Sequence, residues 1–228
     1  MIVKKWLSYL IPINIKQEQS VYSKNLEVTW SNGQLVLDSA NANYSYGSLQ
    51  RILRIGLYEI GFDQIQNMQH IIVLGVAGGS VIKTLVNEID YQNKITGVEI
   101  DAGVIQLAKQ YFGLDSIANF KLILADAHDF VLQTKERCNL LIIDIFQDTA
   151  MPDFLFEKQF IHRIWEILET DGFILFNTMC FSEADFARNK MFLQFFTEYP
   201  ATTRTISRVE KFNEIILIQK LRNNAAAD

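Results

Sequence analysis

Hydrophobic residues in this chain form short uninterrupted runs that alternate with segments of helical periodicity. The clearest run, Ile71 to Leu74, is followed by a glycine-rich turn over residues 75–79, and apolar residues at helical spacing resume at Val81. A run of aliphatic residues without polar alternation is typical of a strand buried on both faces, as in a parallel sheet covered by helices. The pattern therefore predicts a strand, a tight turn and the first turn of a helix.

The same alternation continues along the chain. Apolar runs predict four further strands, and stretches with apolar residues on one helical face separate them. Strands that alternate with helices indicate a parallel sheet, doubly wound with right-handed crossovers. The predicted strands are 71–74, 94–100, 121–125, 140–145 and 173–177, and the predicted helices are 81–89, 104–111, 129–134 and 160–168, the last one stopped by Asp171-Gly172.

The C-terminal part departs from this alternation. After a helix predicted over 183–199, two strands at 204–209 and 214–219 are joined by only a few residues, which is too short for a crossover. We therefore expect these two strands to be antiparallel to each other. A doubly wound, mostly parallel seven-stranded sheet that ends in an antiparallel hairpin resembles the Rossmann-like α/β fold of class I S-adenosylmethionine-dependent methyltransferases.

Residues 1–45 are predicted to form an extension to this domain, which is expected to occupy residues 46–228. An amphipathic helix closed by Pro12 comes first, and interruption of its apolar stretch argues against a secretory signal peptide. Asn32-Gly33 then separates two strand-like runs, 26–30 and 34–37, which is the strongest short-range signal for a β-hairpin. A helix with one apolar face is predicted from residue 46 to residue 60.

Composition and charge narrow the class of protein. The 228 residues are 49% hydrophobic and 21% charged, with a net charge of −5 and scattered basic residues, so no nucleic-acid partner is expected. Cys138 and Cys180 are isolated and have no partner at metal-ligand spacing, which predicts no metal site and a cytoplasmic location. No segment has the roughly 18 to 20 consecutive apolar residues that a membrane span requires, so no membrane is expected.

The glycine-rich turn is the first candidate for a binding site. Gly75, Gly78 and Gly79 leave backbone N–H groups and the N-terminus of the next helix open to a ribose, a carboxylate or a phosphate. Ala77 and Ser80 weaken a dinucleotide-binding interpretation. The GxGxxG fingerprint would have glycine at position 77 and glycine or alanine at position 80. The alternative is a turn whose glycines serve only close packing.

Acidic residues follow several predicted strands. Ligands of such a fold bind beyond the carboxyl ends of the strands, where Glu99, Asp101, Asp126 and Asp144 lie. Glu99 stands about 20 residues past the turn, where a carboxylate can accept both hydroxyls of a ribose. Asp126 and Ala127 are candidates for binding adenine, and Asp144 for facing the reactive end of a cofactor. Each acid could instead end a strand or cap a helix.

The histidines suggest no catalytic constellation. His70 and His128 are predicted to lie at the surface or in loops, and His162 on a helix. Their spacing indicates neither a Ser/His/Asp nor a Cys/His arrangement.

Several motifs resemble the spermidine synthase (polyamine aminopropyltransferase) family, in the same order and over roughly residues 26 to 220. They are VLGVAGGSVIKTL, GVEID, LADAHDF and LLIIDIFQDTAMPDFLFEKQFIHRIWEILETDGFILFN. The resemblance implies a class I methyltransferase fold with an N-terminal β domain, S-adenosylmethionine or its decarboxylated form as cofactor, and often a homodimer. It also implies that Glu99 binds ribose, that Asp126 lies by the adenine, and that Asp144 is the first aspartate of the family's catalytic Asp-x-x-Asp pair.

The chain departs from this family where aminopropyl transfer is decided. Gly78 stands where the family's GGGDGG turn has the acid that binds the amine of the decarboxylated cofactor. The second catalytic aspartate falls at Gln147, although Asp148 next to it could substitute. The family's Tyr-His-Glu becomes Tyr46-Gly47-Ser48. These losses point away from a diamine substrate.

The sequence therefore predicts an S-adenosylmethionine-dependent transferase that moves a methyl group to a small-molecule acceptor. Asp144 or Asp148 would hold an amine or take a proton, while the protein aligns the acceptor for in-line attack. Two alternatives stay open: aminopropyl transfer with Asp148 in place of the missing aspartate, and a cofactor-binding module that has lost its chemistry. The residues expected to line the acceptor pocket are Tyr46, Gln50, Phe146, Gln147 and Phe154.

Overall fold

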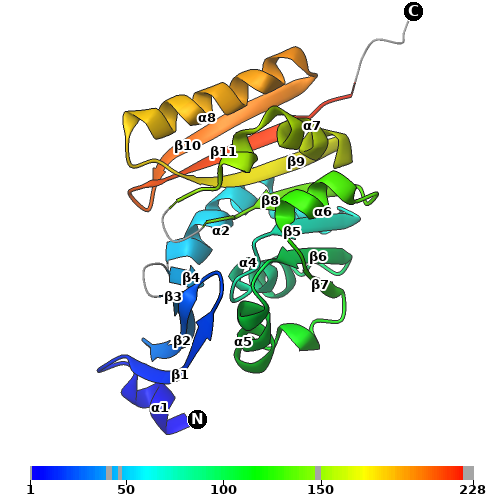
Figure 1. Cartoon of the computed structure of the whole chain (residues 1–228). Coiled ribbons are helices and arrows are strands. Elements are labelled where there is room, and N and C mark those ends of the chain that lie inside the picture. The colour runs from blue at the N-terminus through cyan, green and yellow to red at the C-terminus, as the bar shows by residue number, and fades with distance from the viewer. Residues whose placement is uncertain (1, 40–42, 46–47, 147–149, 223–228) are drawn as a thin grey trace, which may run out of the picture.

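The computed structural model describes residues 2–39, 43–45, 48–146 and 150–222, which form two β-sheets and the helices that cover them (Figure 1). The larger sheet has seven strands in the order β10-β11-β9-β8-β5-β6-β7. In this sheet β5, β6, β7, β8 and β9 are parallel to one another, and β11 and β10 add an antiparallel edge. The predicted fold is therefore confirmed. The strands are β5 (His70–Leu74), β6 (Lys94–Glu99), β7 (Phe120–Leu124), β8 (Cys138–Ile143), β9 (Leu168–Met179), β10 (Ala201–Val209) and β11 (Asn213–Lys220).

Helices pack on both faces of this sheet because its central strands are apolar on both sides. In β5, Ile71 and Val73 belong to one buried cluster, whereas Ile72 and Leu74 belong to another on the opposite face. The first face is covered by α2 (Ser48–Ile60), α3 (Phe62–Gln66), α4 (Ser80–Lys83), the π-helical turn Thr84–Glu88 and part of α5 (Ala102–Phe112). The second face is covered by α6 (Ala127–Gln133), α7 (Lys158–Ile167), α8 (Glu183–Phe195) and the 3-10 turns Asp153–Phe156 and Phe196–Glu198.

The N-terminal region is wider than the predicted hairpin. The hairpin itself is present, with Asn32 and Gly33 both at positive φ between β2 (Lys24–Ser31) and β3 (Gln34–Ser39). It belongs to a four-stranded antiparallel sheet that also contains β1 (Ile13–Ser20) and β4 (Asn43–Ser45), and α1 (Ile2–Leu7) precedes it. The strand β1 was missed because its residues, INIKQEQS, are mostly polar.

This small sheet lies against α5 rather than against the large sheet (Figure 1). Leu26, Val28 and Leu37 form a separate buried cluster with residues of α5, and all three side chains are fully buried. The apolar positions alternate along β2, as expected for a strand with one buried face. The contact fixes the small sheet on the helix that begins beside the predicted cofactor site.

One predicted helix boundary was wrong. Asp171-Gly172 was expected to stop the helix over 160–168, but α7 ends at Ile167 and β9 begins at Leu168. The pairing with β8 shifts here, because Cys138 lies opposite Leu168 and Leu140 lies opposite Phe173. Asp171, at a φ of 63°, therefore belongs to a bulge inside a long strand.

The histidine predictions need a second correction. His70 was expected at the surface or in a loop, but it begins β5 and is only 8% exposed. Its Nδ1 lies 2.7 Å from the carbonyl oxygen of Arg137, and its Nε2 lies 2.9 Å from Oγ1 of Thr96. Burial lowers the pKa of His70; the bond with the Arg137 carbonyl and the charge of Glu136 act against this shift, while Lys94 adds to it. His128 lies in the first turn of α6, and His162 lies on α7 as predicted.

The buried position of His70 predicts a pH-dependent stability. The pKa of His70 is lowered in the folded protein. The contribution of His70 to the free energy of unfolding is therefore present above pH 6.5, its usual pKa, and is lost as the pH falls below that value. We expect His70→Gln to reduce the stability difference between pH 7.5 and pH 5 relative to wild type, as measured by urea unfolding. His162→Gln, at an exposed position of α7 where the pair with Glu166 is screened by solvent, is the control and should change that difference much less. Equal effects of the two substitutions would contradict the assignment.

Candidate active site

The turn after β5 is shaped by close packing against the end of β8. Gly75, with a φ of 84°, could not carry a side chain, since a Cβ there would lie 2.1 Å from the carbonyl oxygen of Asp144. Gly79 is held in the same way against Leu114, at 2.4 Å. The packing alternative thus accounts for these two glycines. Ala77 also adopts a positive φ of 48°, which an L-residue seldom does, so the loop is held from outside.

Glu99 provides that external hold. Its Oε2 accepts hydrogen bonds from the N–H groups of Val76 at 3.1 Å and Ala77 at 3.0 Å, and its Oε1 accepts one from Asp101 at 3.1 Å. A carboxylate has about four acceptor positions, so these bonds leave about one for a ligand hydroxyl. Burial raises the pKa of Glu99 although the three N–H groups act against it. Its role toward a ribose stays a prediction.

Two of the remaining strand-end acids, Asp126 and Asp101, act as helix caps. Asp126 precedes α6 and accepts a hydrogen bond from the N–H of His128 at 2.7 Å. Asp101 precedes α5 and accepts from the N–H groups of Gly103 and Val104. The capping alternative is therefore realised for both. Among the described contacts, only Oδ1 of Asp126 accepts a hydrogen bond. Ala127 is partly buried against the core. The predicted contact of both residues with adenine stays untested.

Asp144 directly follows β8 and lies at the carboxyl edge of the sheet, where the sequence placed it. Its N–H donates to the carbonyl oxygen of Leu74, so its backbone is tied to the end of β5. Its Oδ1 accepts a hydrogen bond of 2.8 Å from Nδ2 of Asn177. Burial raises the pKa of Asp144 to about 6; the bond from Asn177 lowers it, and the negative charge of Glu99 raises it further.

Asn177 and Asn213 are site residues that the sequence reasoning missed. Nδ2 of Asn213 donates to Oδ1 of Asn177 at 2.9 Å, so Asn177 presents its Nδ2 to Asp144 and its amide orientation is fixed. Asn177 is 0% exposed and directly follows the apolar run of residues 173–176 in β9. A polar residue in a run such as FILFN was the available signal, because a buried amide needs partners.

The predicted acceptor residues separate into three groups. Gln50 of α2 lies 3.5 Å from Oγ1 of Thr84, and Phe146 lies two residues beyond Asp144 and is half-buried. Phe154 is half-buried and packs on the rings of Phe160 and His128, with centroids 5.1 and 5.3 Å away, so its predicted place in the acceptor pocket stays untested. The predictions for Tyr46, Gln147 and Asp148 fall outside the described residues.

The site is acidic and has no neutralising cation in the part of the chain described. The negative charge of Glu99 raises the pKa of Asp144, and neither carboxylate forms an ion pair with any described residue. Two carboxylates held together at one edge would be stabilised by a cationic ligand, such as a sulfonium or an ammonium group. No group of three or more described histidine, cysteine, aspartate or glutamate residues is arranged to hold a metal ion.

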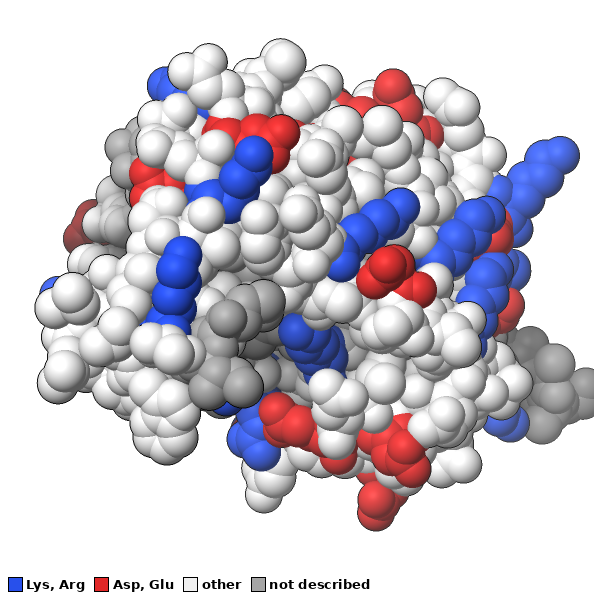
Figure 2. All heavy atoms as spheres, turned by 90° about the horizontal axis from the view of Figure 1, so that it is seen from below, with Lys and Arg blue, Asp and Glu red and all other residues white. Residues whose placement is uncertain are grey.

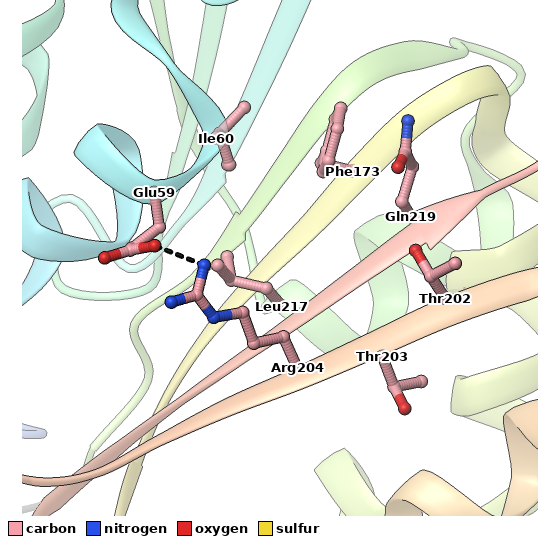
Figure 3. A pocket seen from close by; sticks show the side chains of 8 residues that line it. All are labelled: Glu59, Ile60, Phe173, Thr202, Thr203, Arg204, Leu217 and Gln219. Atoms are coloured by element: carbon pink, nitrogen blue, oxygen red, sulfur yellow. Dashed lines mark ion pairs between the residues drawn. The ribbon is translucent and has the colours of Figure 1, made fainter.

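A separate pocket lies at the other edge of the sheet. It has a volume of about 290 Å³ and is lined by residues such as Glu59, Phe173, Arg204 and Gln219. Figure 3 shows Arg204 of β10 directed at Glu59 of α2, with which it forms an ion pair. Phe173 and Gln219 lie opposite each other where β9 begins its regular pairing with β8. Asp144 follows the other end of β8, so the pocket lies at the opposite end of these strands from Asp144.

The molecular surface adds two observations. On the face seen from below in Figure 2, Lys and Arg side chains are interspersed with Asp and Glu side chains, and neither sign forms a continuous field. Among the helices formed by described residues, none is both long enough and apolar enough to cross a bilayer.

Solved structures with the same fold include transferases. Spermidine synthase from Thermotoga maritima superimposes with a TM-score of 0.69 at 16% identity, over 91% of this chain and 72% of that one. Human methyltransferase-like protein 13, solved in complex with SAH, gives a TM-score of 0.64 at 19% identity, over 80% of this chain and 86% of that one. At such identities the likeness shows the fold, which is that of class I methyltransferases.

The sequence comparison is more specific. The polyamine aminopropyltransferase of Erwinia tasmaniensis is 30% identical over 127 residues, or 53% of this chain, and that of Serratia proteamaculans is 30% identical over 125 residues, or 52%. The matched segment spans less than half the length of these relatives, 44% and 43%. The model of the spermine/spermidine synthase domain matches residues 55–206, more than half of the 228 residues. This chain therefore belongs to the spermine/spermidine synthase family.

Proposed function

We propose that the protein transfers an aminopropyl group from decarboxylated S-adenosylmethionine to a small amine. Family membership and the aminopropyltransferase relatives favour this reaction over the methyl transfer expected from the sequence. The observation that carries the proposal is Asp144: its carboxylate is oriented by Asn177, has a pKa raised to about 6, and stands beside the glycine turn.

The residues around the turn fit an S-adenosyl donor. Glu99 has acceptor capacity left for a ribose hydroxyl, and Asp126 has an oxygen left for an adenine amino group. The donor supplies a sulfonium, which makes the adjacent carbon electrophilic and leaves as a neutral thioether. Glu99 and Asp144 would place two carboxylates near that positive charge, and neither is paired with a described cation. A spermidine synthase of the same fold was solved with the transition-state analogue AdoDATO.

Asp144 would serve the acceptor. An amine attacks only as the free base, so the site must hold it and remove a proton. Asp144 can accept the proton that the new C–N bond releases, because a base with a pKa of about 6 is ionised at neutral pH and is close enough to that pH to take part in proton transfer. The bond from Asn177 uses Oδ1, so within the described part of the chain the second oxygen, Oδ2, is left to contact the amine.

Methyl transfer from intact S-adenosylmethionine is the second candidate, and Gly78 favours it. An acid at this position would bind the lone ammonium of the decarboxylated donor and repel the carboxylate of the intact donor. Gly78 is buried in the turn and does neither. Discrimination between the two donors should therefore be weaker than in a site with an acid there, so the intact donor is admissible.

Product analysis with both donors tests the proposal. We expect mass spectrometry to detect an aminopropylated amine when the protein is incubated with decarboxylated donor and a panel of diamines. A methylated product formed only from the intact donor would replace the proposal by the second candidate. Binding of either donor without any product would identify a cofactor-binding module.

Glu99→Gln tests the donor site. The substitution keeps the size of the side chain and removes its charge, so a charge-assisted bond to the ribose would be lost together with part of the hold on the backbone amides of the loop. We expect the affinity for S-adenosylhomocysteine, measured by calorimetry, to fall by about 1.5 to 3 kcal/mol. Glu136→Gln, which removes a carboxylate paired with Lys94 at the opposite edge of the sheet, should leave the affinity unchanged. An unchanged affinity of Glu99→Gln would remove Glu99 from the site.

Asp144→Asn should separate activity from stability. Turnover should fall by at least about a hundredfold because the proton acceptor is lost. Since the native pKa is raised to about 6, Asp144 contributes stability below about pH 4 that is lost as the pH rises through 6. The variant should therefore be more stable than wild type at pH 8, by up to about 3 kcal/mol, and equal to it near pH 3. A variant that is less stable at pH 8 and still active would assign Asp144 to the scaffold.

Gly78→Asp should change the choice of donor. Gly78 has no positive φ, so an L side chain imposes no backbone strain there, and an aspartate would be placed to bind the lone ammonium of the decarboxylated donor. We expect the ratio of the two dissociation constants to shift by roughly tenfold or more toward the decarboxylated form. Gly78→Asn has the same shape without the charge and should shift the ratio little. Equal shifts in both variants would show that charge at this position does not select the donor.

A further inference from the structure

Two serines of the N-terminal sheet contact the acid that caps α5. Ser20 and Ser23 both donate their hydroxyl hydrogen to Oδ2 of Asp101, the latter at 2.7 Å, across about 80 residues of chain. Ser20 is the last residue of β1, and Ser23 lies in the turn before β2. The hydroxyl oxygen of Ser20 also accepts from the N–H groups of Tyr22 and Ser23, so the turn sets its direction.

Asp101 is a buried carboxylate that depends on these bonds. It is 3% exposed and forms no ion pair with a described residue. Its Oδ1 accepts from the N–H groups of Gly103 and Val104, at 2.9 and 3.3 Å, and its Oδ2 accepts from the two serines. Four donors thus fill its acceptor positions. Without the serines, half of this carboxylate would be buried without a partner, and the loop would rearrange to hydrate it.

The same loop holds the predicted ribose acid. The backbone N–H of Asp101 donates to Oε1 of Glu99, and Oε2 of Glu99 holds the amides of Val76 and Ala77. The contacts therefore run without a break from the serines of the N-terminal sheet through Asp101 and Glu99 to the glycine-rich turn. Because Ala77 has a positive φ, the turn relies on that outside support.

We infer that Ser20 and Ser23 are positioning residues for the donor site, so that the N-terminal sheet sets the geometry of Glu99 and of the glycine-rich turn. This inference rests on the proposed function for the identity of the ligand. The apolar contact of the sheet with α5 supplies its attachment, and the two hydroxyl groups supply its effect on the site.

Binding and amide exchange together test this inference. We expect the double variant Ser20→Ala/Ser23→Ala to bind S-adenosylhomocysteine about five- to tenfold more weakly than wild type, as measured by calorimetry. Ser20→Thr keeps the hydroxyl group at a half-buried strand end and should retain wild-type affinity. Wild-type affinity in the double variant would overturn the inference.

Hydrogen exchange followed by NMR decides the question without a ligand. In the double variant the amides of Val76 and Ala77 should exchange roughly tenfold faster, while those of Ile216 and Ile218 in β11 should not change. Val28→Ala loosens the same sheet by removing a buried side chain that forms none of these hydrogen bonds, and it should leave Val76 and Ala77 protected. Unchanged exchange at Val76 and Ala77 in the double variant, or equal acceleration in Val28→Ala, would overturn the inference. If wild type binds no S-adenosyl compound, the proposed function fails, and the exchange result still decides the role of the serines.

Discussion

The close approach of β5 and β8 at Gly75 is the constraint on which the site depends. With no side chain at Gly75, the carbonyl oxygen of Asp144 occupies the space that a Cβ would need. This contact lies between the two central strands where the strand order reverses, since the chain runs outward through β6 and β7 and then returns to β8. Ligands of open α/β sheets bind at such a point. The same contact places Asp144 beside the turn that would receive the donor.

The second feature is a concentration of negative charge that the described residues do not neutralise. The pKa values of both Glu99 and Asp144 are raised, and burial is the main cause in each case. Such an arrangement costs stability in the free protein, and natural proteins retain costs of this kind mainly at functional sites. A cationic ligand would recover part of that cost on binding. The charge of the site therefore agrees with a sulfonium donor and an amine acceptor.

The N-terminal sheet has two different connections to the rest of the molecule. An apolar cluster fastens it to α5, and two serine hydroxyls reach the cap of the same helix. Apolar contacts tolerate small displacements, whereas hydrogen bonds to a buried carboxylate depend on direction and distance. The first connection therefore determines that the sheet is attached, and the second determines where Glu99 and the glycine-rich turn lie.

The sequence by itself determined the order and type of most elements, because a strand buried on both faces needs a continuous apolar run and a covering helix needs apolar residues at its own period. It also determined that Glu99 and Asp144 lie at the carboxyl edge of the sheet, since each follows such a run. Tertiary structure alone decided which partners these acids have. Asn177 reaches Asp144 from 33 residues away, and Ser20 reaches Asp101 from 81 residues away, so no local pattern reports these bonds. The burial of His70 was also decided by the tertiary structure. The hydrogen-bond partners of its ring, Arg137 and Thr96, come from other parts of the chain.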